Sequence, residues 1–186
     1  MDAEYIQRVL NGDARAYSYL VDKYRDMAYS LAIGIVKSTP IAEEVTQDAF
    51  LKAYSSLGKF EHRAKLSTWL YKIVTNEALR RVRKKQLQYT DDVSELNNAE
   101  YAEINDSIAS LTEEEQKFYI NKSLEKLLPN DNLVLRLFYL EELSLKEIGE
   151  VTGFSKTNIK TILHRARKRF YHVLKQELKQ EIRSIL

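Results

Sequence analysis

The chain has 186 residues, of which 44% are hydrophobic and 30% are charged, an ordinary composition for a folded protein. It contains no cysteine, which excludes disulfides and thiolate metal sites, and its five glycines and two prolines favour helix over turn-rich folds. No apolar run approaches the roughly 20 residues that span a bilayer, and the acidic start of the chain is unlike an export signal. We therefore expect a cytoplasmic protein without membrane insertion.

Charge is strongly segregated along the chain, although the net charge is only +2. Residues 63–85 contain eight basic residues and one acidic residue, and residues 155–175 contain seven basic residues and no acidic one. Residues 86–116, between them, contain nine acidic residues and no basic one. Because blocks of one sign repel themselves unless a partner neutralises them, this order indicates a polyanion that the protein contacts at two places. Three solvated faces of one helical bundle are the alternative.

Apolar residues recur with a helical period through the first half of the chain. One stripe follows Asp13, the expected N-cap, and a second follows Thr39-Pro40, which reads as a cap with proline in the first turn. After a short loop, residues 67–85 begin with inward-facing apolar positions and end in cations. These segments predict a small all-helical domain of about four helices over residues 1–85.

The pattern changes over residues 86–117, where periodicity fades and Asn, Ser, Asp and Glu accumulate. We expect an acidic flexible linker there, with at most patchy helix. Helical order resumes afterwards, so residues 118–186 are predicted to form a second small domain. The expected fold is all-α, with two helical domains joined by the linker.

Residues 143–169 have the pattern of a helix-turn-helix. Ser144 and Glu147 have the spacing of a capping box, and Gly153 suits the turn because glycine adopts a left-handed backbone at little cost. One face of the last helix is polar at spacings of i, i+3, i+4, i+7, i+8 and i+11, which suits base edges and phosphates in a major groove. Its residues are Thr157, Lys160, Thr161, His164, Arg165 and Lys168. A basic helix that caps a bundle is the alternative.

The segment 67–85 combines aromatic residues at its start with cations at its end. The cations fit a phosphate backbone, which gives affinity and salt dependence without sequence choice. Trp69 and Tyr71 fit either the core or a stack on unpaired bases, and the amide of Asn76 can both donate to and accept from a base edge. The clustered cations are Arg80, Arg81, Arg83, Lys84 and Lys85.

Three stretches carry a family pattern: AEEVTQDAFLKAY (42–54), FEHRAKLSTWLYKIVTNEALRRVRKK (60–85) and LPNDNLVLRLFYLEELSLKEIGEVTGFSKTNIKTILHRARKRF (128–170). In this order and at these separations they resemble bacterial sigma-70 family RNA polymerase sigma factors of the extracytoplasmic-function (ECF) type. The resemblance covers nearly the whole chain. It implies a sigma-2-like domain in residues 1–85 and a sigma-4-like domain in residues 118–186. The linker 86–117 would run through polymerase channels or serve as a solubilising tether.

The resemblance also implies a partner for each surface. Core RNA polymerase would be bound through its β′ clamp helices and its β subunit. The β′ clamp helices would meet Glu44, Gln47, Asp48, Leu51 and Lys52. The melted −10 strand of a promoter would meet Arg63, Lys65, Thr68, Trp69, Lys72, Asn76, Arg80, Arg81 and Arg83. The −35 duplex would meet the polar face of the recognition helix, from Thr157 to Lys168. An anti-sigma factor is a further expected partner.

An enzyme is not expected from this sequence. The three histidines lack metal-ligand spacing, and neither a glycine-rich phosphate loop nor a nucleophile–base constellation is present. We therefore expect no cofactor and no metal. A helix-turn-helix regulator that works without polymerase is the alternative function, but it would need a dimer interface or sensor domain. A helical adaptor that binds only proteins leaves both basic blocks unexplained.

Overall fold

The computed structural model describes residues 2–62, 64–82 and 96–185, with side chains as far as residue 179. Over these ranges the chain is helical with no β-strand, which confirms the all-α prediction. The chain divides into two compact units. The first comprises residues 1–86 and 144–154, and the second comprises residues 87–143 and 155–186.

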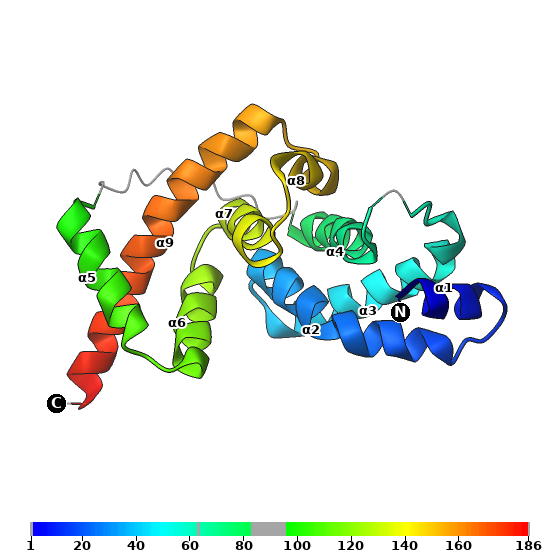
Figure 1. Cartoon of the computed structure of the whole chain (residues 1–186), viewed down its shortest axis with the longest axis horizontal. Helices are drawn as coiled ribbons and strands as arrows, with labels where there is room; N and C mark the ends of the chain where they lie inside the picture. Colours follow the sequence, from blue (N-terminus) through cyan, green and yellow to red (C-terminus); the bar gives the residue numbers. More distant parts are fainter. Residues whose placement is uncertain (1, 63, 83–95, 186) are drawn as a thin grey trace. The chain divides into compact units, whose positions relative to one another are not determined.

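The first unit is a bundle in which α2, α3 and α4 pack against one another and α1 packs on α2 (Figure 1). Alanines at 0–1% exposure, among them Ala32, Ala42 and Ala78, let these helices approach closely. The helices of this unit are α1 (Asp2–Leu10), α2 (Ala16–Val36), α3 (Thr39–Ser56), α4 (Leu66–Val82) and α8 (Leu145–Thr152).

Local chemistry sets where α2 and α3 begin and end. Asp13 accepts a hydrogen bond from the backbone N–H of Ala16 at 3.3 Å, but α2 begins only at Ala16, so Asp13 belongs to the turn before the helix. The helix α2 ends at Val36, and Lys37 after it reverses the chain with a left-handed φ of 55°. The helix α3 then begins after Ser38, with Pro40 in its first turn.

A buried carboxylate ties α3 to α4. Glu77 of α4 is only 3% exposed and binds Lys52 of α3 and, at 2.8 Å, the guanidinium of Arg80. Burial by itself raises the pKa of Glu77, but the hydrogen bonds from Lys52 and Arg80 outweigh it, so the pKa lies below its ordinary value. The charge is tolerated inside the bundle because both oxygens are paired.

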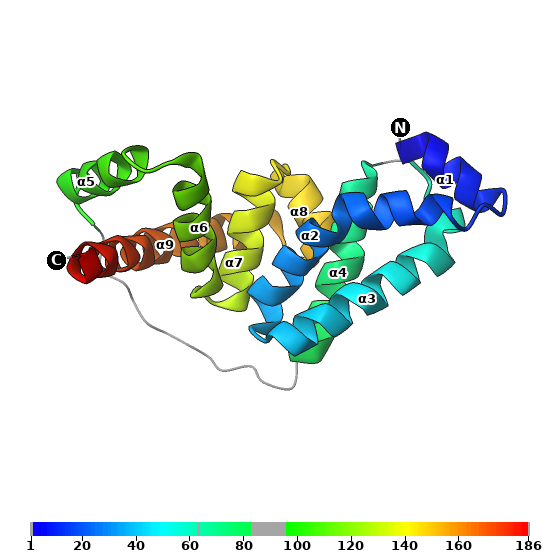
Figure 2. The ribbon, with the colours of Figure 1, turned by 90° about the horizontal axis from the view of Figure 1, so that it is seen from below.

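The second unit is built along one long helix. Figures 1 and 2 show α5, α6 and α7 beside α9, and the contacts of each with α9 agree. Leu174 and Leu178 of α9 pack with Ile104 of α5 and Tyr119 of α6 in one apolar cluster. The elements are α5 (Asn98–Ala109), α6 (Glu113–Glu125), α7 (Pro129–Leu135), the π-helix η2 (Arg136–Leu140) and α9 (Lys156–Ile185).

The helix α5 lies where the sequence predicted a linker with at most patchy helix, and for residues 98–109 that expectation is wrong. Asn97 caps the helix in a reciprocal capping box with Glu100. Because Ile104 is the one residue that α5 buries fully, its apolar stripe is too narrow to give a visible period. The part of the predicted linker at 86–95 lies outside the described residues.

Two local features predicted for residues 143–169, the capping box and the glycine turn, are confirmed. Ser144 accepts a hydrogen bond from the N–H of Glu147, whose carboxylate accepts one from the N–H of Ser144 at 2.9 Å. Gly153 ends α8 with a left-handed φ of 76°, and α9 begins three residues later.

The left-handed turn at Gly153 gives the first prediction. Gly153→Ala should lower the free energy of unfolding by about 1–2 kcal/mol, because a side chain disfavours a positive φ. No neighbouring atom lies within 4 Å of the added Cβ, so the cost is in the backbone alone. Gly58→Ala is the matched control, since its Cβ would meet Leu10 at an ordinary 3.7 Å and no positive φ is required. Urea unfolding measures both, and equal losses would contradict the prediction.

The buried Glu77 gives the second prediction. Glu77→Gln should lower the free energy of unfolding at pH 7 by about 1–3 kcal/mol, because an amide cannot satisfy two cations in a buried position. The folded-state pKa of Glu77 is lowered, so its carboxylate stabilises the fold above the unfolded-state pKa. That stabilisation is lost as pH falls through the lower folded-state pKa.

Urea unfolding of wild type and Glu77→Gln across this pH range tests the linkage. The difference between the two proteins should shrink towards acid pH. Glu43→Gln on the exposed surface of α3 removes the same charge and should change stability little. A difference that stays constant with pH would show that Glu77 acts through packing and not through its charge.

Candidate nucleic-acid interface

One side of α4 presents cations and an amide to solvent. Lys72, Asn76 and Arg80 are all exposed and follow one another at every fourth residue, so they share a face of the helix. Lys65 is exposed just before the helix begins. The ion pair with Glu77 holds the guanidinium of Arg80 at the end of this face. We call Lys65, Lys72, Asn76 and Arg80 the α4 face.

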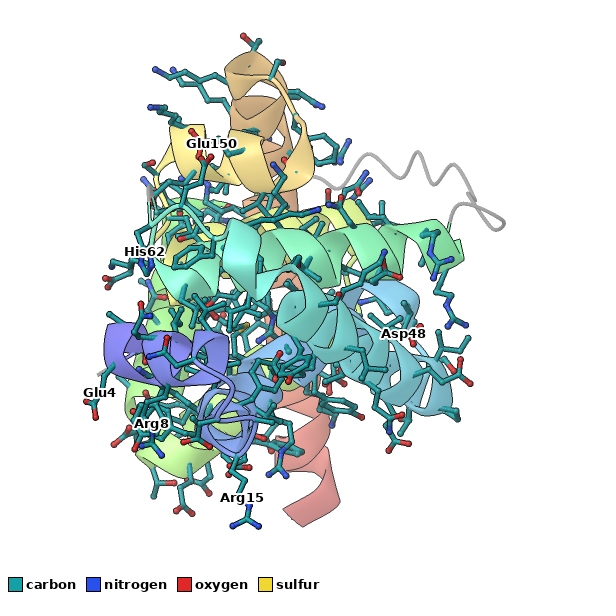
Figure 3. The ribbon with its side chains drawn as sticks, turned by 90° about the vertical axis from the view of Figure 1, so that its right-hand side faces the viewer. Glu4, Arg8, Arg15, Asp48, His62 and Glu150 are labelled. Atoms are coloured by element: carbon teal, nitrogen blue, oxygen red, sulfur yellow. The ribbon has the colours of Figure 1, made fainter. Side chains whose placement is uncertain are left out.

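Arg81, the next residue, is arranged differently. Its guanidinium binds the carboxylates of Glu44 at 2.9 Å and Asp48 at 3.0 Å, both on α3. The hydrogen bond to Asp48 is the main cause of a raised pKa for Arg81. Figure 3 shows Asp48 at the surface of the unit. Because all three side chains are partly exposed, such pairs are worth only about 0–1 kcal/mol and exchange readily for another partner.

The start of α4 is aromatic, and its residues divide between core and surface. Trp69 is half-buried against the core that Leu66 and Leu70 help to form, and its ring lies 5.4 Å from that of Phe60. The ring of Phe60 in turn lies 4.6 Å from that of His62. His62 is exposed and is labelled in Figure 3. The sequence predicted a loop before α4 but did not single out Phe60 and His62 as part of the site. The two rings separated by one residue in Phe-Glu-His could have indicated them.

Of three other residues predicted to bind the −10 strand, the structure describes only Thr68. Thr68 is 4% exposed, and its hydroxyl is buried without a hydrogen-bond partner in the described structure. Its side chain therefore does not reach the α4 face. Arg63 and Arg83 lie outside the described residues.

The residues predicted to meet polymerase lie together on α3. Glu44, Gln47, Asp48 and Leu51 fall on one face, and Lys52 lies at its edge, where it binds Glu77. Leu51 is 70% exposed, and the large apolar side chains of Ile41 and Tyr54 are exposed on the same face. Exposed apolar side chains gathered among charges are typical of a surface that binds another protein.

The polar face of α9 is exposed, as the sequence predicts. Ile159, Ile162, Leu163 and Ala166 are buried on the opposite side of the helix. Lys168 is partly buried, and Arg165 also pairs with Asp131 of α7 at 2.6 Å. The exposed members of this face are Thr157, Lys160, Thr161, His164 and Arg165.

Among the described residues no three His, Asp or Glu side chains gather as metal ligands would. In the described part of the chain no helix combines the length and apolarity needed to cross a membrane.

Two family models match the chain. The model of Sigma-70 region 2 matches residues 20–88, which include α3 and α4, and the model of Sigma-70 region 4 matches residues 117–170, which include α8 and the polar face of α9. The two basic surfaces thus fall in two different regions of one family.

Curated relatives match over most of their length. An ECF RNA polymerase sigma factor of Bacillus subtilis, SigW, is 35% identical over 174 residues, covering 88% of this chain and 91% of that protein. The ECF sigma-E factor of Escherichia coli K12 is 28% identical over 174 residues, covering 90% of this chain and 91% of that protein. The sigma-H factor of Pseudomonas aeruginosa is 26% identical over 186 residues, covering 96% of each.

Solved structures share the fold at lower identity. The sigma factor RpoE of Bartonella quintana, crystallised with the anti-sigma factor NepR, matches with a TM-score of 0.61 and 20% identity, over 86% of this chain and 96% of that one. CnrH, in complex with the cytosolic domain of CnrY, matches with a TM-score of 0.57 and 19% identity, over 92% and 96%. With both family regions and the curated relatives in agreement, the chain belongs to the sigma-70 family of RNA polymerase sigma factors, in its ECF group.

Proposed function

We propose that this sigma factor binds bacterial core RNA polymerase, directs it to specific promoters and helps to melt their −10 region. One observation carries the proposal: two exposed cationic faces lie on helices of two different family regions, α4 in region 2 and α9 in region 4. Two separate faces fit two separate promoter elements. The sigma-2-like domain of residues 1–85 and the sigma-4-like domain of residues 118–186 are the corresponding parts of the chain.

The α4 face is suited to a single strand. Its cations bind phosphates, and the amide of Asn76 reaches a base edge. The rings of Phe60, His62 and Trp69 offer a surface on which an unpaired base can stack, worth roughly 1–3 kcal/mol per base. That gain offsets the few kcal/mol that unstacking a base from the duplex costs.

The α9 face is suited to duplex DNA. Thr157, Lys160, Thr161 and His164 lie in the first half of the helix, where a recognition helix meets base edges in the major groove. Lys160 adds a charge that binds either a base or a phosphate.

The exposed face of α3 is proposed to bind the polymerase, through its β′ clamp helices, with a further contact to β. Leu51 supplies apolar area, and Glu44 and Asp48 supply negative charge that a cationic partner surface can take over from Arg81. Arg81 would then be released towards the promoter phosphates. The proposed exchange costs little because the pairs are exposed.

Regulation is proposed to run through an anti-sigma factor. One similar structure is that of the sigma factor RpoE crystallised with the anti-sigma factor NepR, and the other is that of CnrH in complex with the cytosolic domain of CnrY. We further propose that the protein acts in the cytoplasm, where polymerase and promoters are found, and that it contributes no catalytic chemistry or cofactor. The comparisons favour this function over a helix-turn-helix regulator that works without polymerase.

Run-off transcription tests the two DNA faces. Added to core polymerase, the protein should give promoter-dependent transcripts, and no transcript above core alone would refute the function.

The salt dependence of promoter binding by the holoenzyme tests each face separately. Lys65→Gln with Lys72→Gln should flatten the slope of log affinity for promoter DNA against log salt concentration by about 1.4, because two single-strand phosphate contacts are lost. Lys160→Gln should flatten it by about 0.9, because one duplex phosphate contact is lost. Exposed Arg25→Gln on α2 is the control and should leave the slope unchanged.

Direct binding to core polymerase tests the α3 face. Leu51→Ala should weaken binding about tenfold or more, since a leucine buried in an interface contributes about 1.5–3 kcal/mol. The melting temperature should not change, because Leu51 is exposed in the unbound chain. Leu10→Ala on α1 removes another exposed leucine and should leave the affinity as it is. Competition with a labelled sigma factor measures both, and equal affinities for the two variants would reject the proposed surface.

A further inference from the structure

One carboxylate in the second unit joins the core to the polar face of α9. Asp131 of α7 has no solvent exposure, and its two oxygens bind two arginines of α9. Oδ1 accepts a hydrogen bond from Arg165 at 2.6 Å, and Oδ2 accepts one from Arg169 at 2.7 Å. Bonds this short between charged groups are the strong kind, and they fix the geometry of both partners.

The two arginines lie on different sides of that carboxylate. Arg169 is 8% exposed and belongs to the core. The side chain of Arg165 is 46% exposed and lies on the polar face beside Thr161 and His164. Because buried Arg169 holds Asp131 in place, Asp131 presents a fixed anchor to Arg165.

The charges of Asp131, Arg165 and Arg169 do not sum to zero. Asp131 with Arg169 alone would already be neutral, so the second arginine leaves one net positive charge on the exposed member. An ion pair that served only to stabilise the core would not need the second arginine. The excess cation lies where the proposed function puts DNA.

We propose that Asp131 is a positioning residue, which orients the guanidinium of Arg165 so that its remaining N–H groups meet a guanine edge in the −35 duplex. The inference rests on the proposed function of α9. An arginine fork pairs with O6 and N7 of guanine through two parallel hydrogen bonds, and this requires a defined orientation of the planar group. A side chain already oriented before binding loses less freedom when it binds.

The decisive comparison is Arg165→Lys against Arg167→Lys in the holoenzyme. Lysine keeps the charge but lacks the planar fork. Wild type and variants are assayed on two templates in one reaction, a promoter with its −35 element and the same promoter with that element scrambled. Arg165→Lys should reduce the ratio of the two transcripts about tenfold, the value of one bidentate base contact. Its salt dependence should stay at the wild-type value, since no charge is lost.

Arg167→Lys is the matched control. Arg167 is exposed on α9 outside the polar stripe, and it bonds to the carbonyl of Leu163 and the hydroxyl of Tyr139. Its transcript ratio should equal that of wild type. The ratio of two templates in one reaction cancels a global loss of folded protein, and Arg167→Lys reports the effect of a comparable change elsewhere on α9.

Asp131→Asn tests the positioning itself. It should reduce the transcript ratio to the level of Arg165→Lys, and the double variant should fall no further, because both changes remove the same oriented contact. Should Asp131→Asn fail to fold, the transcript ratios of Arg165→Lys and Arg167→Lys still test whether Arg165 reads the −35 element.

The outcomes separate the two proposals. A wild-type protein that directs no promoter-dependent transcription refutes the proposed function. A wild-type protein that selects the promoter, with Arg165→Lys selecting it equally well, refutes only the inference. Independent, additive losses from Asp131→Asn and Arg165→Lys would also refute it.

Discussion

Buried carboxylates that each bind two cations are the interaction on which the basic helices of this protein depend. Glu77 binds Lys52 and Arg80 in the first unit. In the second unit Asp131 binds Arg165 and Arg169. Buried Glu177 of α9 binds Lys122 and Lys126 at the end of α6, and the hydrogen bonds from these two lysines lower the pKa of Glu177. Each carboxylate binds a cation of a neighbouring helix, so these pairs tie α4 to α3, α7 to α9 and α9 to α6.

This arrangement also shapes the surface that the protein offers to a polyanion. A cation held by an internal carboxylate points in one direction, as Arg80 and Arg165 do, and so acts as an oriented donor. Lys72 and Lys160 instead lie on long flexible stems, which suits phosphates at variable positions. Both kinds of cation occur on α4 and on α9, so each helix combines an oriented donor with a flexible one.

The sequence predicted the local geometry well where short-range chemistry decides it. The capping box of Ser144 and Glu147, the left-handed Gly153 and the buried stripe that includes Ile159 all lie within a few residues of the atoms that fix them. It failed for α5, which buries Ile104 fully and depends on packing against Leu174 and Leu178, seventy residues later. An apolar stripe this narrow shows no helical period in the sequence, although the spacing of Asn97 and Glu100 is that of a capping box.

By itself the sequence determined the helical content, the family and the two basic blocks, because periodicity, caps and charge runs are properties of neighbouring residues. Only the tertiary structure decided which cations face outward and which are paired. Arg81 meets Glu44 and Asp48, and Arg165 meets Asp131, across more than thirty residues of chain. Ion pairs between helices depend on how the helices pack, and no local pattern encodes that partner.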